Sequence, residues 1–236
     1  MTPLRAAWLL VAHPVALFFR LVPLRRRFRV MLALGRVAGA IFGPAVMRRN
    51  RRTPSSANHD EGIRLLMRAL ADGNTTYDVD LELDVRDPIE PRALFVSGHY
   101  PLNPLFIRWL YDGGLHPVGI KAFPEIDPCI SGTRTPLDVL GQTHALLLKV
   151  KRRFDAGRSV VQYADGGKLP VEVDGYTYTV DAQILEFARR ENIPTYFFCV
   201  RTQRGRLPLL LLQRIEPDPY VFAACCHEQR RALGAL

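Results

Sequence analysis

The 236-residue chain is 48% hydrophobic and 23% charged, which is typical of a folded globular protein with a core large enough to need no disulfides. Its four cysteines, at positions 129, 199, 225 and 226, have the spacing of neither a zinc site nor a C-x-x-C redox pair. We therefore expect reduced thiols, no metal site and no tightly bound cofactor.

The formal net charge of +9 belongs to one end of the chain. Residues 1–52 contain eleven arginines and no lysine, aspartate or glutamate, whereas the rest of the chain has 21 basic and 23 acidic residues. This asymmetry predicts two parts: a basic, apolar helical arm over residues 1–52 and an α/β domain over residues 53–236.

The arm alternates apolar segments, 4–22 and 30–47, with clusters of arginine. The first segment is interrupted by Arg20 and by Pro14, which we expect to kink it, and it falls short of the roughly 20 residues that span a bilayer. Such helices suit a membrane interface, where anionic headgroups attract each cation by ~1 kcal/mol. A secretory signal peptide is one alternative, but no small-residue cleavage site follows the first apolar segment cleanly. Nucleic-acid binding is another, and it is disfavoured because apolar blocks separate the arginines. The arm is predicted to associate with a membrane surface, and it can also pack on the body as an ordinary helical subdomain.

The first half of the body contains the residue around which the rest is organised. A helix over 63–70 is followed by an alternating segment, 77–85, that predicts a half-buried strand near a sheet edge. Residues 93–96 then form a short buried strand that ends in Ser97-Gly98-His99, and Pro101 and Pro104 open an apolar helix. A histidine at the carboxyl end of a strand is well placed to act as a general base, although it could equally be a satisfied structural histidine.

The second half continues the alternation of strands and helices. We expect strands at 116–121 and 159–163, an irregular substrate-lining loop at 123–134 and a helix over 136–154. A hairpin at 172–180, a helix over 181–191 capped by Asp181, strands at 194–200 and 207–215, and a helix from about residue 220 complete the chain. The pattern predicts an α/β fold with a central, mostly parallel or mixed sheet flanked by helices.

The strand at 159–163 is followed by a second polar turn, Asp165-Gly166-Gly167-Lys168. A carboxylate and exposed backbone N–H groups in a permissive turn could receive an anion or an oxyanion, although most Asp-Gly-Gly sequences are simply turns.

The order of the arm, strands, helices and polar turns along the chain resembles that of the lysophospholipid acyltransferase superfamily. Within this superfamily, the chain is most similar to the lipid A late (lauroyl/myristoyl) acyltransferase branch. The likeness is carried by Ser-Gly-His at 97–99, by the block from Ala156 to Gly167, and by the helix and strand from Asp181 to Val200. It is loose from residue 1 to about 217 and reaches the level of motifs only within 93–200. The sequence lacks the C-terminal extension usual in the lipid A branch, which makes acyl transfer the firmer expectation and lipid A the less firm one.

The family's H-x4-D/E motif implies that His99 is the general base and that an acidic residue orients its imidazole. Here the acidic position is occupied by Pro104. Asn103 could orient the ring as a neutral substitute, or the carboxylate could come from Asp165 or from Asp127.

The resemblance implies a membrane-associated O-acyltransferase at the cytoplasmic face of a bacterial inner membrane. It would move an acyl group from a thioester of acyl carrier protein or coenzyme A to a hydroxyl of a lipid or glycolipid. The candidate catalytic residues are His99, Asn103 and Asp165. The candidate substrate-binding residues, which would hold the oxyanion or a phosphate, are Gly98, Arg134, Gly166, Gly167 and Lys168.

Two other functions remain open at this point. One is a catalytically degenerate lipid-binding or accessory protein on the same fold. The other, a serine or cysteine hydrolase, is poorly supported, because Ser97 is not in a G-x-S-x-G elbow and Cys129 lacks an identifiable activating partner.

Overall fold

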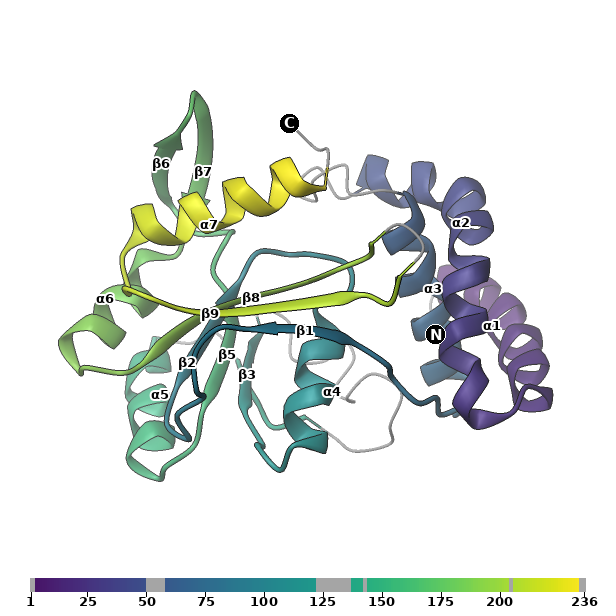
Figure 1. The fold of residues 1–236 in the computed structure, drawn as a ribbon, viewed down its shortest axis with the longest axis horizontal. Coiled ribbons are helices and arrows are strands. Elements are labelled where there is room, and N and C mark those ends of the chain that lie inside the picture. Colours follow the sequence, from purple (N-terminus) through teal and green to yellow (C-terminus); the bar gives the residue numbers. More distant parts are fainter. Residues whose placement is uncertain (1–2, 50–57, 122–136, 142–143, 204–205, 234–236) are drawn as a thin grey trace.

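The structure is a computed structural model that describes residues 3–49, 58–121, 137–141, 144–203 and 206–233. Within these ranges it has seven helices and a seven-stranded sheet, so the predicted α/β fold with a mixed, helix-flanked sheet is confirmed (Figure 1). The helices are α1 (Pro3–Leu21), α2 (Leu24–Arg49), α3 (Asn58–Asp72), α4 (Pro104–Asp112), α5 (Leu146–Asp155), α6 (Ala182–Arg190) and α7 (Pro219–Ala232).

The sheet has the strand order β1-β9-β8-β2-β5-β3-β4, and every neighbouring pair is parallel except β8–β9. Its strands are β1 (Glu82–Val85), β2 (Leu94–Ser97), β3 (Val118–Lys121), β4 (Val139–Gly141), β5 (Val160–Tyr163), β8 (Thr195–Arg201) and β9 (Leu209–Ile215). Because β8, β2, β5, β3 and β4 run in the same direction, their C-terminal ends form one edge, which we call the carboxyl edge.

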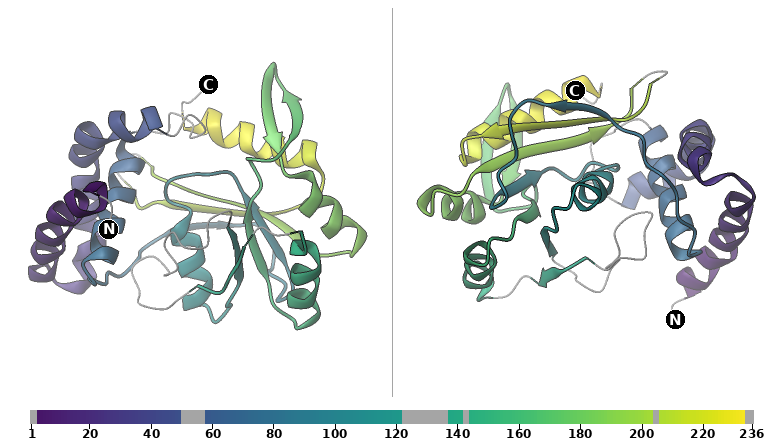
Figure 2. Two further views of the ribbon diagram at one scale, coloured as in Figure 1. Left: turned by 180° about the vertical axis from the view of Figure 1, so that it is seen from behind. Right: turned by 60° about the horizontal axis from the view of Figure 1, so that its bottom comes forward.

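Helices cover both faces of the sheet, and the central strands alternate their side chains between the two layers (Figure 2). On one face, α5, α6 and α7 pack through Phe154, Ile184 and Phe222 against residues such as Val96. On the other face, the core contains Phe106 of α4 together with apolar residues of the arm, including Phe28.

The helices α1, α2 and α3 stand together at one end of the molecule, with α5 and α6 at the other end (Figures 1 and 2). The contact between α2 and α3 is so close that a Cβ added at Gly62 would lie 1.9 Å from the Gly35 carbonyl oxygen. Thus α3, on the domain side of the predicted boundary, packs against the two arm helices. The helix α1 continues through Pro14, and α2 begins before the Arg25–Arg29 cluster. No described helix combines the length and apolarity needed to cross a membrane.

Two predicted elements are wrong in detail. The segment 136–154 is not one helix: its described residues form β4, which pairs in parallel with β3, and then α5. In the alternating segment 77–85, only the last four residues form a strand, because β1 pairs with β9 over that length alone. β1 does lie at a sheet edge, but its apolar side chains are not covered, since Leu83 is 51% and Val85 38% exposed.

The predicted hairpin is formed by β6 (Leu169–Val173) and β7 (Tyr176–Val180), which pair only with each other. Its two-residue turn has positive φ angles at both Asp174 (49°) and Gly175 (78°), as in a type I′ turn. The hairpin packs on α7, where the Tyr178 hydroxyl lies 3.0 Å from His227 Nδ1. It therefore links the Asp165 turn, which precedes it, to the C-terminal helix.

One buried carboxyl group joins α3 to the carboxyl edge. Asp60 of α3 is 1% exposed and accepts hydrogen bonds from the hydroxyl and backbone N–H of Thr202, just after β8. Burial raises the pKa of Asp60 from 3.8 to about 6, although the hydrogen bonds from Thr202 and the charge of Arg201 oppose the rise. The folded protein therefore holds this proton more tightly than the unfolded chain does.

The pH dependence of stability should reveal this group. The stabilisation contributed by protonated Asp60 is complete below pH 4 and is lost as the pH rises through about 6. Asp60→Asn stays neutral, so its free energy of unfolding relative to the wild type should rise by about 2 kcal/mol between pH 4 and 7. Urea unfolding at several pH values measures this difference. Asp155→Asn, at an exposed site, is the control, and a difference that does not change with pH for Asp60→Asn would contradict the expectation.

Candidate functional site

The candidate site lies at the carboxyl edge, where the neighbouring strands β2 and β5 end. The two strands are parallel and place Ser97 opposite Tyr163. The chain leaves β2 through Gly98 and His99 and leaves β5 through Ala164 and Asp165. Strand pairing thus brings together two polar segments separated by 66 residues in the sequence.

Asp165 holds His99 at two points. One carboxylate oxygen accepts a hydrogen bond of 2.8 Å from the His99 backbone N–H, and the other lies against the imidazole Nδ1. The Asp165 side chain is 14% exposed, whereas that of His99 is 57% exposed. The carboxylate is therefore set into the protein while the imidazole faces solvent.

This arrangement fixes the chemistry of the ring. A carboxylate accepts hydrogen bonds, so Nδ1 carries the hydrogen and the neutral imidazole keeps its lone pair on Nε2. When Nε2 takes up a proton, the adjacent carboxylate stabilises the resulting imidazolium. The pair has the geometry of a general base with its orienting acid.

Two glycines allow the close approach. A Cβ at Gly98 would lie 3.3 Å from an Asp165 carboxylate oxygen and 3.1 Å from the Tyr100 ring. A Cβ at Gly167 would lie 2.1 Å from the Val180 carbonyl oxygen, against the junction of β7 and α6. Both were expected to bind substrate; in the structure a side chain at Gly98 would be tight, and one at Gly167 would clash with the backbone.

Asn103 is buried, but it is not hydrogen-bonded to the His99 ring. Its Nδ2 donates to Ser97 Oγ and to the Gly98 carbonyl, each at 2.8 Å, and its Oδ1 accepts from the Val200 backbone N–H at 3.0 Å. Asn103 therefore ties the end of β2 to β8 and supports the backbone that carries His99. Of the three candidate partners for His99, Asp165 is in contact with its ring.

The remaining predicted site residues are either exposed or outside the described ranges. Gly166 and Lys168 are exposed in the turn that follows β5. Arg134 and Asp127 lie outside the described residues, as does the whole of the predicted substrate-lining loop at 123–134.

Tyr163 is a neighbour of His99 that sequence analysis did not select. Its ring centroid is 4.9 Å from that of the imidazole, with an angle of 41° between the planes. The only signal in the sequence was its position two residues before Asp165, at the end of a predicted strand. An apolar and aromatic strand gives no reason to single out its last member.

The described residues offer no covalent nucleophile to His99. Ser97 is fully buried, its hydroxyl donates to the Phe198 carbonyl, and its oxygen accepts from Asn103. Burial raises the pKa of the Cys225 thiol to about 11 and also raises the pKa values of Cys199 and Cys226. These thiols stay protonated at neutral pH, so they do not support the hydrolase alternative; Cys129 is outside the described ranges.

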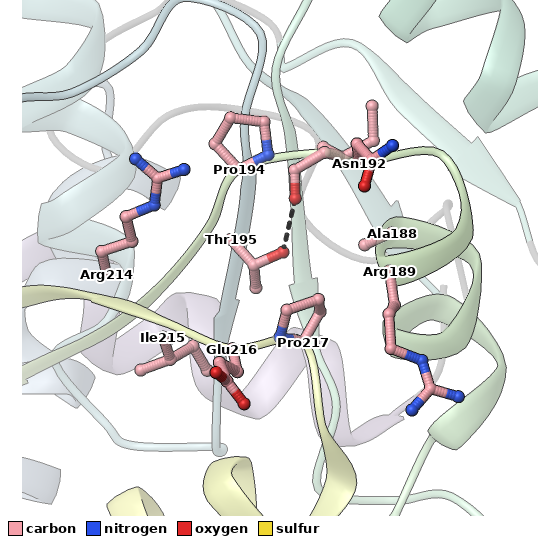
Figure 3. Close-up of a pocket in the computed structure, with 10 residues that line it drawn as sticks. Ala188, Arg189, Asn192, Pro194, Thr195, Arg214, Ile215, Glu216 and Pro217 are labelled. Carbon is pink, nitrogen blue, oxygen red and sulfur yellow. Dashed lines mark hydrogen bonds between the residues drawn. The ribbon is translucent and has the colours of Figure 1, made fainter.

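A pocket of about 300 Å³ lies at the opposite edge of the sheet (Figure 3). It is lined by residues around the beginning of β8 and the end of β9, where the Thr195 hydroxyl donates to the Ile193 carbonyl at 3.1 Å. It is separated from His99 by the length of the parallel strands, so it does not belong to the candidate site. Within the described parts of the chain, no cluster of three or more histidine, cysteine or acidic side chains could hold a metal ion.

Neither a model of a known protein family nor a curated protein matches this sequence.

Proposed function

We propose that the protein is a membrane-associated O-acyltransferase that moves a fatty acyl group from a thioester donor to a hydroxyl of a lipid or glycolipid. The observation that carries the proposal is the His99–Asp165 pair at the carboxyl edge, in which Nδ1 contacts the carboxylate and the imidazole is exposed to solvent. Open α/β sheets bind ligands at this edge.

In the proposed reaction, His99 Nε2 removes the proton from the acceptor hydroxyl as its oxygen attacks the thioester carbonyl carbon. A C–O bond forms, and the carbonyl becomes a tetrahedral oxyanion. The oxyanion then collapses, the C–S bond breaks, and the imidazolium returns its proton to the departing thiolate. The products are an ester and a free thiol, and His99 ends in its starting state.

The surroundings of His99 favour direct transfer over a covalent acyl-enzyme. The nearest hydroxyl on the strand, that of Ser97, is buried and engaged in hydrogen bonds. Nε2 of the exposed imidazole therefore takes its proton from a hydroxyl brought by a substrate. The resemblance to lysophospholipid acyltransferases leads to the same chemistry, with Asp165 supplying the carboxylate that Pro104 does not.

The arm supports association with a membrane surface. On α1, Ala12, Ala16 and Phe19 are buried, while the other side of the helix leaves large apolar residues exposed. Nine apolar residues of α1 and α2 are between 37% and 85% exposed: Leu10, Val11, Leu17, Phe18, Leu21, Leu24, Leu34, Val37 and Ile41. Arginines 25, 26, 29 and 36 are exposed beside them.

Apolar side chains and arginines together suit an anionic lipid surface, such as the cytoplasmic face of a bacterial inner membrane. Sedimentation with anionic but not with neutral vesicles tests this surface.

Acyl transfer by the purified protein in lipid vesicles tests the proposed activity. Radiolabelled acyl thioesters of carrier protein and of coenzyme A are supplied with lipid and glycolipid acceptors. We expect transfer by the wild type and its loss in His99→Ala, because no other described group takes the place of the base. His144→Ala, at another exposed histidine, is the control and should keep wild-type activity.

Two results would count against this function. Equal transfer by the wild type and His99→Ala would remove His99 from the mechanism. Lipid binding without transfer, across all donors and acceptors, would favour the accessory-protein alternative.

A further inference from the structure

Tyr163 differs from Tyr100, Tyr178 and Tyr196 in the partners of its hydroxyl. The hydroxyl of Tyr100 donates to the Cys226 carbonyl, that of Tyr196 donates to the Pro88 carbonyl, and that of Tyr178 contacts His227. Within the described residues, the Tyr163 hydroxyl forms no hydrogen bond, although its ring is partly buried. Because the residue is only partly buried, and its hydroxyl is not among the buried polar atoms without a partner, this donor beside the imidazole is open to water or to a bound ligand.

The position of Tyr163 relates it to the reacting groups. It ends β5 opposite Ser97, and its ring lies beside that of His99. Its side chain packs on the same face of the sheet as Val161 and Phe198, the face covered by α4 and the arm. A substrate held with its hydroxyl at His99 Nε2 therefore has Tyr163 next to it, on the side from which an acyl chain would approach along the arm.

We infer that the Tyr163 hydroxyl is a catalytic hydrogen-bond donor to the oxyanion of the tetrahedral intermediate. The inference rests on the proposed acyl transfer and adds to it a residue that no motif assigns. No proton changes hands in this contact: the phenol donates a hydrogen bond while the carbonyl oxygen is negative, and the bond weakens when the carbonyl re-forms.

The electrostatic setting keeps the phenol in the form that can donate. Burial, with a smaller contribution from the negative charge of Asp165, raises the pKa of Tyr163 above its ordinary value of 10.0. The hydroxyl therefore remains protonated across the pH range in which neutral His99 acts as a base. A donor that is fixed in place beside the reacting groups stabilises a developing charge more strongly than mobile water does.

The backbone N–H groups of the Asp165-Gly166-Gly167 turn were the donors expected from sequence. Gly167, however, is pressed against Val180 and Asp181, and Gly166 is exposed to solvent. Tyr163 is next to the imidazole and semi-sheltered, which favours it as the donor that acts at the reacting carbonyl.

The test is steady-state acyl transfer by Tyr163→Phe, which keeps the ring and removes only the hydroxyl. We expect kcat to fall by about 10²–10³-fold, the typical effect of losing one oxyanion donor, with little change in KM. The pH at which activity is half-maximal should stay at its wild-type value, because His99 and Asp165 are untouched. Tyr196→Phe removes a phenol from the far end of β8 and should leave kcat unchanged, while thermal unfolding monitors the fold of both variants.

The outcomes separate this inference from the proposed function. A Tyr163→Phe protein with wild-type kcat, or with only a raised KM, overturns the role of Tyr163 and leaves acyl transfer standing. An equal loss of kcat in Tyr196→Phe shows a general structural effect and also overturns it. If the wild type transfers no acyl group, the proposed function fails, and the inference fails with it.

Discussion

Replacing Asp165 by asparagine is expected to lower kcat for acyl transfer by about 10³–10⁴-fold, the loss seen when a buried acid that orients a catalytic histidine becomes an amide. The reason lies in the two hydrogen bonds of Asp165. The His99 backbone N–H needs an acceptor, so the single oxygen of an asparagine would turn toward it. The amide NH₂ would then face Nδ1, and the ring would place its hydrogen on Nε2. His99 would keep its position but lose the lone pair that accepts the proton.

The measurements are kcat and the tautomer of His99, the latter from ¹⁵N NMR of the imidazole. Asp181→Asn is the matched control, because Asp181 follows the same hairpin and its carboxylate accepts a 2.7 Å hydrogen bond from Gln162 rather than from His99. The control should retain activity and the wild-type tautomer. A normal kcat in Asp165→Asn would exclude the His99–Asp165 pair as the catalytic base.

The elements of this site could be predicted from the sequence, but their pairing could not. Short apolar runs followed by glycine placed His99 and Asp165 each at the end of a strand, and both positions agree with the structure. Whether those strands are neighbours depends on sheet order, which local patterns do not encode. That is why Asn103, Asp165 and Asp127 remained open as partners of His99. Asn103 looked suitable because of its proximity in the sequence, yet its amide is used by Ser97, Gly98 and Val200.

The two wrong elements have a common physical origin. In 136–154, a leucine-rich run satisfies helical periodicity, but three of its residues gain more by pairing with β3 than by extending α5. In 77–85, strict alternation predicted a covered face, yet the edge position of β1 leaves Leu83 and Val85 exposed. In both cases tertiary pairing, rather than local preference, decided the outcome.

Substituting alanine for Gly167 should damage both the fold and the activity. The new Cβ would lie 2.1 Å from the Val180 carbonyl oxygen and 2.2 Å from the Asp181 nitrogen. Both are backbone atoms, and Asp181 N also donates a 2.8 Å hydrogen bond to the Ala164 carbonyl, so neither atom can move aside alone. The turn that carries Asp165 must shift instead. We expect a loss of about 1–3 kcal/mol in the free energy of unfolding and about 10²-fold in kcat, the cost of misplacing a catalytic group by about 1 Å.

Urea unfolding measures the loss of stability, and the acyl-transfer assay measures the loss of kcat. Gly113→Ala is the control, because a Cβ there would have its nearest neighbours at 3.5 Å, an ordinary contact distance. It should preserve both stability and kcat. If Gly167→Ala loses stability but keeps wild-type kcat, then the exact position of the Asp165 turn does not matter for catalysis. That result would contradict a mechanism in which Asp165 holds His99 in its reactive tautomer, even if the protein proves to be an acyltransferase.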